Sequence, residues 1–408
     1  MIFEAFKPVL QQRSATVVSN GGGLFGMFGA TASGKPVTTN SALTLSAFYN
    51  ALEIISNDYA KMPKAVFQNI DGNRTKQRNH PVHNLISKRP NALMSAFMLD
   101  KMLIQSAILK GNGYAEVVRN QYSAKPEQVF YINQDKTPVK VTLSEGKLWY
   151  HFNNKTVAAE NMLHYPGFSF NGITGIGIVQ FAANSLGIGL SSAEFASDYY
   201  KNKGQGTIVL ASNSAMDATA KTRYAEAFRS RIDQPGNTKV VVADEIKGVQ
   251  NLKLTPQEAL LLETNNAVVL EVARFLNIPP HKLKQIDNSN FSNMESQNIQ
   301  HVADSILPWS IKFQQEQEYK LFSKTEIEAG YYIKHNTAIL LQADKKTQAE
   351  YYRTMVNIMA YTPQEIREFE ELNKIDGLNE PFVPVNMQPL SVAQINYKDK
   401  KQGNTQNS

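Results

Sequence analysis

The sequence predicts an α+β fold, and three observations lead to that prediction. Its 408 residues are 42% hydrophobic, enough for the cores of two or three domains of about 150 residues each. Several long stretches repeat apolar residues every three or four positions, which is the period of a helix. Between residues 113 and 152, short apolar runs alternate with turns instead, as strands do.

The composition excludes several classes of protein. No apolar run reaches the roughly 18 residues of a membrane span, and no signal-peptide pattern opens the chain, so no membrane partner is expected. There is no cysteine, which excludes disulfides, thiolate nucleophiles and thiolate metal sites. Basic residues outnumber acidic ones by 42 to 36, but only 19% of residues are charged, so one copy alone should not hold a DNA duplex tightly.

The first half of the chain is predicted to be one α+β region behind a flexible N-terminal arm. Residues 1–40 are rich in glycine and polar residues, which predicts the arm. Leu45, Phe48 and Leu52 share one helical face. The expected elements, in order, are a helix from 43, a strand at 64–70, a helix at 93–110, strands at 113–119, 128–132, 138–143 and 147–152, a helix at 176–201 and a strand at 207–211.

The middle of the chain predicts two helices around a small insert. Tyr224 and Phe228 stand four residues apart in a helix at 218–232, which a Pro-Gly-Asn turn ends. A strand-rich insert follows, and Thr255-Pro256-Gln257-Glu258 has the form of a capping box. The helix that begins there should run to about Leu276. It is apolar around most of its circumference, so it needs neighbours on more than one side, either in a single-chain core or between subunits.

The last third is predicted to be mainly helical. A polar stretch at 285–293 leads into a long helix at 294–324, and Pro308 should kink it near Leu307 by removing a backbone hydrogen bond. A strand at 328–335 and helices at 343–360 and 363–373 complete the ordered chain. From residue 381 the composition indicates a tail that does not pack.

One stretch has the spacing of a phosphate-binding loop. The sequence GATASGKP at 29–36 places Gly34-Lys35 five residues after Gly29. The next residue, however, is Pro36, which has neither the hydroxyl that binds Mg²⁺ nor an amide hydrogen. Neither flank is the strand or the helix that such a loop needs. A nucleotide-driven ATPase that uses this loop is therefore a weaker interpretation of the stretch than a flexible glycine-rich arm.

Other chemical motifs are incomplete. His80 and His83 have no third ligand at metal spacing, and Gly172, Gly175 and Gly177 form only part of a dinucleotide fingerprint. The remaining histidines are scattered, and the paired acids Asp244-Glu245 are expected in a solvated turn. We therefore predict no catalytic residue, no metal and no cofactor, and the protein is not expected to be an enzyme.

A set of short motifs occurs in a fixed order from about residue 45 to 320. The motifs are His80-Pro81 with Arg89-Pro90-Asn91; Gly111-Asn112-Gly113-Tyr114; Leu163-His164 followed by Asn171-Gly172-Ile173-Thr174-Gly175; Tyr200-Lys201-Asn202 before Thr207-Ile208-Val209-Leu210; Phe275-Leu276-Asn277-Ile278-Pro279-Pro280; Asn293-Met294-Glu295; and Leu307-Pro308. In this order the set resembles the portal proteins of long-tailed bacteriophages. The chain departs from the pattern at Gly177, where many relatives have Ser, and at Lys203-Gly204, which interrupts an Asn-Gly pair.

The resemblance implies the division of a portal subunit. A portal is a ring, usually of twelve copies, at one capsid vertex, and DNA enters and leaves through it. The implied parts are an arm at 1–40, the first part of a wing at 41–216, a stem helix at 217–233, a clip at 234–256, a second stem helix at 257–281, a tunnel loop at 282–293, a kinked helix and the rest of the wing at 294–339, a crown at 340–380 and a disordered tail at 381–408.

The resemblance also implies roles for individual residues. The DNA-facing tunnel loop would contain Lys284, Gln285, Asp287, Asn288, Ser289, Asn290, Ser292 and Asn293. The clip would face the packaging motor or an adaptor with Lys239, Asp244, Glu245, Lys247 and Lys253. The stem would pack between subunits through Tyr224, Phe228, Leu261, Val268 and Val272, and Pro308 would kink the long helix.

The implied partners are other copies of the chain in a probable dodecamer, non-specific double-stranded DNA, the terminase large subunit, the major capsid or scaffold protein and a head-tail adaptor. The implied location is the portal vertex of the virion, after assembly in the host bacterial cytoplasm. The residues alone favour a solvated surface loop at 285–293, and only the resemblance favours a loop that faces the channel. A second alternative is a capsid or adaptor subunit without a DNA channel.

Overall fold

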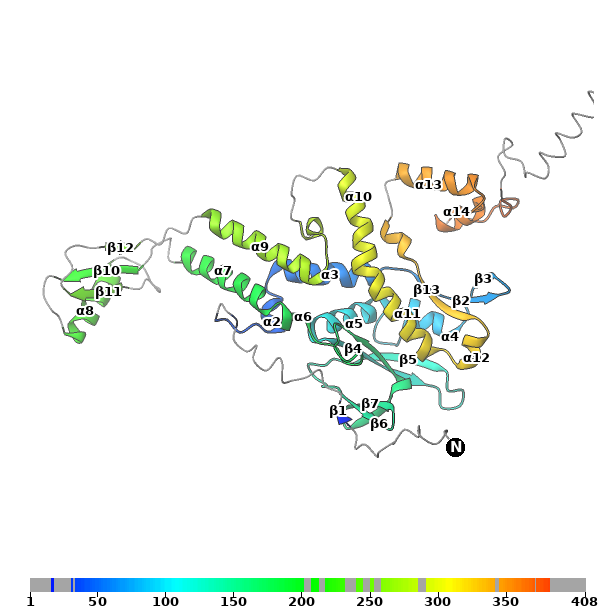
Figure 1. The fold of residues 1–408 in the computed structure, drawn as a ribbon, viewed down its shortest axis with the longest axis horizontal. Coiled ribbons are helices and arrows are strands. Elements are labelled where there is room, and N and C mark those ends of the chain that lie inside the picture. The colour runs from blue at the N-terminus through cyan, green and yellow to red at the C-terminus, as the bar shows by residue number, and fades with distance from the viewer. Residues whose placement is uncertain are drawn as a thin grey trace, which may run out of the picture. The chain divides into compact units, whose positions relative to one another are not determined.

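Figure 1 shows the computed structural model of the chain. The structure describes residues 16–17, 31, 34–201, 207–212, 217–231, 240–244, 250–252, 258–284, 291–341, 345–370 and 372–381. Two compact units make up the chain, Met1–Leu340 and Leu341–Ser408. In the described parts, no helix combines the length and the apolar composition that crossing a bilayer requires.

The core of the first unit forms around two helices that pack together, α3 (Ser46–Ala60) and α5 (Ala96–Lys110). Phe48 and Leu52 are buried on one face of α3, as their spacing predicts. Gly111 ends α5 at φ +89°, and a Cβ there would meet the carbonyl oxygen of Gly175 at 2.5 Å, so only glycine fits.

Three antiparallel sheets complete this body. Their strand orders are β1-β6-β7-β8, β5-β4-β9 and β13-β2-β3. The strands are β1 (Thr16–Val17), β2 (Lys64–Ile70), β3 (Asn73–Lys76), β4 (Asn112–Arg119), β5 (Pro126–Tyr131), β6 (Lys140–Ser144), β7 (Lys147–Phe152), β8 (Lys155–Ala158), β9 (Met162–Pro166) and β13 (Tyr331–His335). Pairing of β13 with β2 joins segments more than 260 residues apart in register, with Tyr331 opposite Gln68.

Several short elements were not predicted from the sequence. They are α2 (Thr39–Ala42), β3, α4 (Pro81–Ser87), β8, β9 and α12 (Lys324–Glu328). The predicted arm also differs from the structure in part, because β1 pairs with β6 and Lys35 forms an ion pair with Glu194. Elements this short have little periodicity of their own and depend on a partner strand or helix.

The expected helix at 176–201 is present as α6 (Ile178–Phe181) and α7 (Ala183–Lys201). A separate small sheet follows with order β11-β10-β12, built from β10 (Thr207–Ser212), β11 (Val240–Asp244) and β12 (Gln250–Leu252). Here β10 and β11 are parallel, and α8 (Ala218–Arg231) lies between them in sequence and packs on β11.

The position of α8 corrects one prediction. We expected 217–233 and 257–281 to be the two stem helices, with a clip at 234–256 between them. Parallel neighbouring strands cannot be joined by a hairpin and need a crossover connection, and α8 is that connection. The partner of α9 (Glu258–Leu276) is instead α7, and α9 also packs on α3.

The predicted long helix occurs in three stretches. These are α10 (Phe291–Gln300), a π-helical turn (His301–Ile306) and α11 (Leu307–Leu321). Pro308 lies in the first turn of α11, directly after the π turn. A wider turn of this kind is one of the recognised ways in which a helix departs from regular geometry near a proline.

The second unit contains the two expected C-terminal helices, α13 (Lys345–Asn357) and α14 (Pro363–Phe369). Thr362 and Glu365 form a capping box at the start of α14. The hydroxyl of Tyr352 in α13 donates to the Glu370 carboxylate at 3.1 Å, which links the two helices.

Candidate functional site

The candidate site consists of the segments on either side of the predicted tunnel loop, from α9 to α11. In α9, Val268, Val272 and Leu276 are buried, whereas Glu263 and Arg274 are exposed. Gly189 of α7 makes the contact with α9 very close, because a Cβ added there would lie 2.9 Å from Cγ1 of Val268. The C-terminal half of α9 therefore belongs to the core of its own chain.

Asn277 joins the end of α9 to the long helix. Its backbone turns at φ +53°, which Asn tolerates better than most residues. Its side-chain amide donates to the carbonyl oxygen of Asp304 at 3.1 Å, and its own carbonyl accepts from the hydroxyl of Ser305. Asp304 is four residues before Pro308, so its carbonyl is the one that the proline deprives of an α-helical donor. The Asn277 amide supplies a replacement.

The same π turn is bonded to α3. His301 is buried, and its Nε2 lies 2.8 Å from the Asp58 carboxylate while its Nδ1 lies 3.2 Å from the Ser305 hydroxyl. Burial alone would raise the pKa of the Asp58 carboxyl, but hydrogen bonds with His301 and Lys61 hold that pKa below its usual value. The carboxylate is therefore ionised in the folded protein at neutral pH.

One hydrogen bond links the chain before the predicted tunnel loop to the helix after it. On one side, the 3₁₀ turn Pro280–Leu283 ends at Lys284, which is exposed at φ +65°. On the other, Ser292 and Asn293 lie in the first turn of α10. His281 Nε2 lies 3.4 Å from the amide oxygen of Asn298, across the base of the loop. The remaining predicted loop residues, Gln285, Asp287, Asn288, Ser289 and Asn290, lie outside the described residues.

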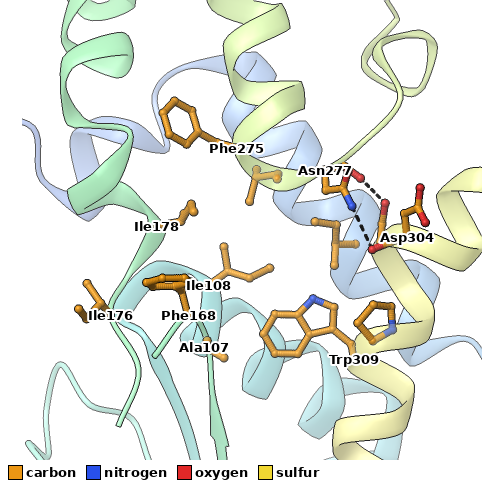
Figure 2. Close-up of a pocket in the computed structure, with 14 residues that line it drawn as sticks. Ala107, Ile108, Phe168, Ile176, Ile178, Phe275, Asn277, Asp304 and Trp309 are labelled. Carbon is orange, nitrogen blue, oxygen red and sulfur yellow. Dashed lines mark hydrogen bonds between the residues drawn. The ribbon is translucent and has the colours of Figure 1, made fainter. Parts of the chain in front are cut away.

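A cavity of about 180 Å³ lies beside this junction (Figure 2). Ile108, Ile176 and Phe275 line it together with Trp309, and Phe168 lies at one side. Asn277, Asp304 and Ser305 form its polar end. No motif in the sequence indicated this cavity, because its lining comes from six separate segments of the chain.

The residues predicted to pack between subunits are dispersed in the structure. Val268 and Val272 are 8% and 2% exposed and pack inside their own chain, which corrects their assignment to an intersubunit seam. Tyr224, on α8, is 60% exposed. Phe228 lies in α8 and Leu261 in α9.

Of the predicted clip residues, Asp244 ends β11 opposite Ser212 of β10. The other four lie outside the described residues: Lys239, Glu245, Lys247 and Lys253.

The lysine of the apparent phosphate-binding loop has another partner. Lys35 Nζ pairs with the Glu194 carboxylate of α7, and the Lys35 backbone bonds to the Thr31 hydroxyl. The ammonium group that would bind a phosphate is thus already neutralised by a carboxylate.

The histidines are also bonded within the fold. His80 lies 3.1 Å from the Glu326 carboxylate, and His83 accepts a hydrogen bond from the Val66 amide. Burial, with Lys320 and Lys312 nearby, lowers the pKa of His164 to about 3, so this side chain is neutral. Across the described ranges, no three His, Cys, Asp or Glu side chains are grouped so that they could hold a metal ion.

Together these features define an architecture: an α+β body with a small β-α-β unit carried on two packed helices. An α+β body leads through α7 into a small β-α-β unit, and α9 returns from it alongside α7. The family model for phage portal proteins matches residues 46–371. The chain belongs to the phage portal protein family, which confirms the resemblance read from its motifs. Its function is that of the family, a portal at a capsid vertex and a component of the virion.

Two curated relatives agree with this assignment. The portal protein of Enterobacteria phage HK97 is 21% identical over 344 residues, covering 82% of this chain and 80% of the relative. The probable portal protein of Streptomyces phage phiC31 is 23% identical over 382 residues, covering 89% and 83%.

Solved structures show the same fold. An HK97-family portal protein from Corynebacterium diphtheriae matches with a TM-score of 0.56 and 18% identity, covering 76% of this chain and 99% of that one. A chain in the virion of a native gene transfer agent matches at 0.52 and 16%, covering 83% and 95%. A chain in the neck of that particle, computed with twelvefold symmetry, matches at 0.50 and 17%, covering 85% and 97%. The α+β prediction is confirmed.

Proposed function

We propose that copies of this chain close into a dodecameric ring, through whose axis double-stranded DNA passes during packaging and ejection. Membership of the portal family over residues 46–371 is the observation that supports this proposal most strongly. A closed ring requires one surface of each copy to meet a different surface of the next. The role of the ring is to conduct DNA and to dock partner proteins, without catalysis.

We further propose that residues 284–293 face the DNA. This stretch contains one lysine, one aspartate and several Asn, Ser and Gln side chains. DNA has one negative charge per roughly 1.7 Å of its axis, so a ring dense in Lys and Arg would retain it. Neutral amides and hydroxyls bond to phosphate or water without fixing sequence or register. Such a loop therefore allows the duplex to slide.

Mass measurement and electron microscopy of the purified protein test the ring. We expect annular particles with an axial hole wider than a DNA duplex, which is about 20 Å across. The hole should leave clearance around the duplex, because the proposed loop binds DNA only weakly. Particles that remain monomeric at assembly concentrations would contradict the proposal.

A charge-addition variant tests the loop. Asn288→Lys with Asn290→Lys adds two positive charges per copy, so rings should bind linear duplex more tightly and with a steeper salt dependence. The matched control is Leu93→Lys with Tyr122→Lys, at positions that are 80% and 97% exposed. Binding is compared at about 50 and 200 mM salt, across which phosphate contacts weaken strongly. If the loop variant and the control respond alike, the loop does not face DNA.

The small β-α-β unit is proposed to dock the terminase large subunit during packaging and a head-tail adaptor afterwards. Its residues of mixed charge are Lys239, Asp244, Glu245, Lys247 and Lys253. Reversing the charge of Asp244 and Glu245 to Lys should weaken terminase pull-down by assembled rings and leave ring assembly intact. The remaining proposed partner is the capsid or scaffold protein at the vertex, in a virion assembled in the bacterial cytoplasm.

The competing hypothesis is a capsid or adaptor subunit without a DNA channel. Deleting residues 285–290 distinguishes the two, because that hypothesis predicts no specific defect in DNA packaging or retention. A channel loop predicts assembled rings whose particles package poorly or lose DNA.

A further inference from the structure

Hydrogen bonds hold the second unit together around α13 and α14. Gln364 is buried at the start of α14; its backbone N–H donates to the carbonyl oxygen of Leu378 at 3.0 Å, and its side-chain oxygen accepts from the backbone N–H of Ile375 at 3.1 Å. At the other end of α14, the Glu370 carboxylate accepts from the side-chain amide of Gln348 in α13 at 2.9 Å. The chain after α14 therefore returns to the start of that helix, and these contacts inside the unit are polar.

The large apolar side chains of the second unit are exposed instead. Among residues 348–370 and 372–381, whose exposure the structure describes, Gln364 is the only buried residue. The apolar side chains that are about half exposed are Tyr351 (46%), Ile358 (56%), Met359 (49%), Phe369 (53%), Leu372 (51%) and Ile375 (47%). Short helices are marginal alone, and most helical stability in proteins comes from the packing of an apolar face. The unit therefore needs a further surface on which to pack.

A row of aromatic rings connects the exposed side chains of the two helices. The ring of Tyr361 lies 6.4 Å from that of Tyr351 in α13 and 5.3 Å from that of Phe369 in α14, edge-on in both cases. The C-terminal apolar surface, defined as the six half-exposed residues above, thus includes side chains from both helices (Figure 1). Exposed apolar surface of this kind generally marks a contact with another protein.

The two helices have opposite net charges. Helix α13, at 345–357, contains three basic residues and one acidic residue, whereas residues 362–370 around α14 contain three acidic residues and one basic residue. Arg353 of α13 and Glu368 of α14 are both exposed, and neither forms an ion pair with another described residue. Opposite charges on two parts of one surface make that surface complementary to a second copy of itself, when α13 of one copy meets α14 of the next.

The proposed ring supplies such a second copy. Each copy in a ring has a neighbour on either side, and the rotation that relates neighbours brings their second units to the same height and the same distance from the axis. A closed ring also requires head-to-tail contacts, in which one surface of each copy meets a different surface of the next. A basic helix and an acidic helix in the same unit provide two such surfaces.

We propose that α13 of one copy packs on α14 of the next and that this contact buries the C-terminal apolar surface between neighbouring copies. The inference rests on the proposed ring and adds to it the surface through which copies meet. The packing that the second unit lacks within its own residues then comes from its two neighbours. The order of α13 and α14 therefore depends on assembly.

Charge reversal in separate copies tests the contact. Assembly of the full chain is followed by mass photometry at about 50 mM salt, where exposed charges are little screened. Arg353→Glu reverses a charge on α13, and Glu368→Lys reverses one on α14. Each variant alone should need about fivefold more protein to form rings, because a pair of like charges replaces a pair of opposite charges at every contact. An equimolar mixture of the two variants should assemble as the natural chain does.

The mixture separates a contact between copies from a contact within one chain. Alternating copies place the new carboxylate on α13 of one variant against the new ammonium group on α14 of the other, and every second contact is the natural one. Mixing cannot repair a contact within one chain. If neither variant weakens assembly, or if the mixture does not recover, the proposal is overturned, although rings of the natural chain would still support the DNA conduit. A natural chain that stays monomeric would overturn both.

Charges placed on the C-terminal apolar surface give a second measurement. Ile358→Asp with Leu372→Asp should shift the full chain from rings to monomers and speed amide hydrogen exchange in α13 and α14, because these helices lose the neighbour on which they pack. The matched control is Leu93→Asp with Tyr122→Asp, at positions of the first unit that are 80% and 97% exposed, and it should change neither. A variant that assembles like its control, or monomers whose α13 and α14 exchange as slowly as in rings, would overturn the proposal.

Discussion

Helix α8 lies inside the small β-α-β unit and α9 follows that unit in the sequence, and the two helices pack in different ways. α8 covers one strand of a three-stranded sheet and presents Tyr224 to solvent. α9 lies between α7 and α3, and its C-terminal half is part of the main core, with Val272 only 2% exposed. The difference teaches that composition and topology act together: α9 is apolar around most of its circumference and packs on two helices, whereas the more polar α8 serves as the crossover of a parallel strand pair.

The largest expected effect comes from placing a charge at the buried position of α9. Val272→Asp would bury an unpaired carboxylate and should lower the free energy of unfolding by at least about 4 kcal/mol. Tyr224→Asp, on exposed α8, should change it by no more than about 0.5 kcal/mol. Urea unfolding measures both. Similar losses in the two variants would mean that α8 and α9 are equally buried.

The next largest effect on the free energy of unfolding is expected from substitution of Asn277, at the end of α9. Asn277→Ala removes the hydrogen bond to Asp304 and also forces a left-handed backbone on alanine, so we expect a loss of about 2–3 kcal/mol. Asn277→Gly keeps that backbone and removes only the hydrogen bond, which should cost about 1 kcal/mol. If the alanine variant is as stable as the glycine variant, the positive φ of residue 277 does not contribute to the loss of stability.

Asp58 should make a pH-dependent contribution through His301. Its folded pKa lies below the unfolded value of about 3.9, so the unfolded state binds more protons in acid. This stability is fully present above the unfolded pKa and is lost as the pH falls through the folded pKa. Asp58→Asn should therefore lower stability by about 1–3 kcal/mol at pH 7 and flatten its acid dependence.

Thermal unfolding of Asp58→Asn between about pH 2 and 7 measures that slope, across the range where paired carboxylates take up protons. Glu263→Gln, on the exposed face of α9, is the control. An unchanged acid slope in Asp58→Asn would show that the pair with His301 does not contribute.

The smallest effect is expected on the solvent side of α9. Arg274 and Glu271 form an ion pair at 2.5 Å three residues apart, with the arginine side chain 72% exposed. Exposed pairs of this kind contribute less than about 1 kcal/mol and are screened by salt. Arg274→Ala should therefore change the urea midpoint little. A large change would indicate that the ion pair is more buried than its exposure implies.

Much of the fold followed from local sequence patterns. The strand at 64–70 and the end of the helix at Gly111 depend on periodicity and on glycine, which act over a few residues. A π turn stands directly before the helix that contains Pro308, and the kink itself stays a prediction. The motifs from His80 to Pro308 also resembled one family, and that resemblance is confirmed. The tunnel-loop and clip roles stay predictions.

Tertiary structure decided what depends on distant partners. The parallel pairing of β10 with β11 makes α8 a crossover, and Gly189 lets Val268 approach α7 closely. The bond from Asn277 to Asp304 spans 27 residues and satisfies a carbonyl that Pro308 leaves without its helical donor. Local patterns determine which segments become helices and strands. Which of these segments pack together depends on hydrogen-bond satisfaction and steric fit between residues far apart in the chain.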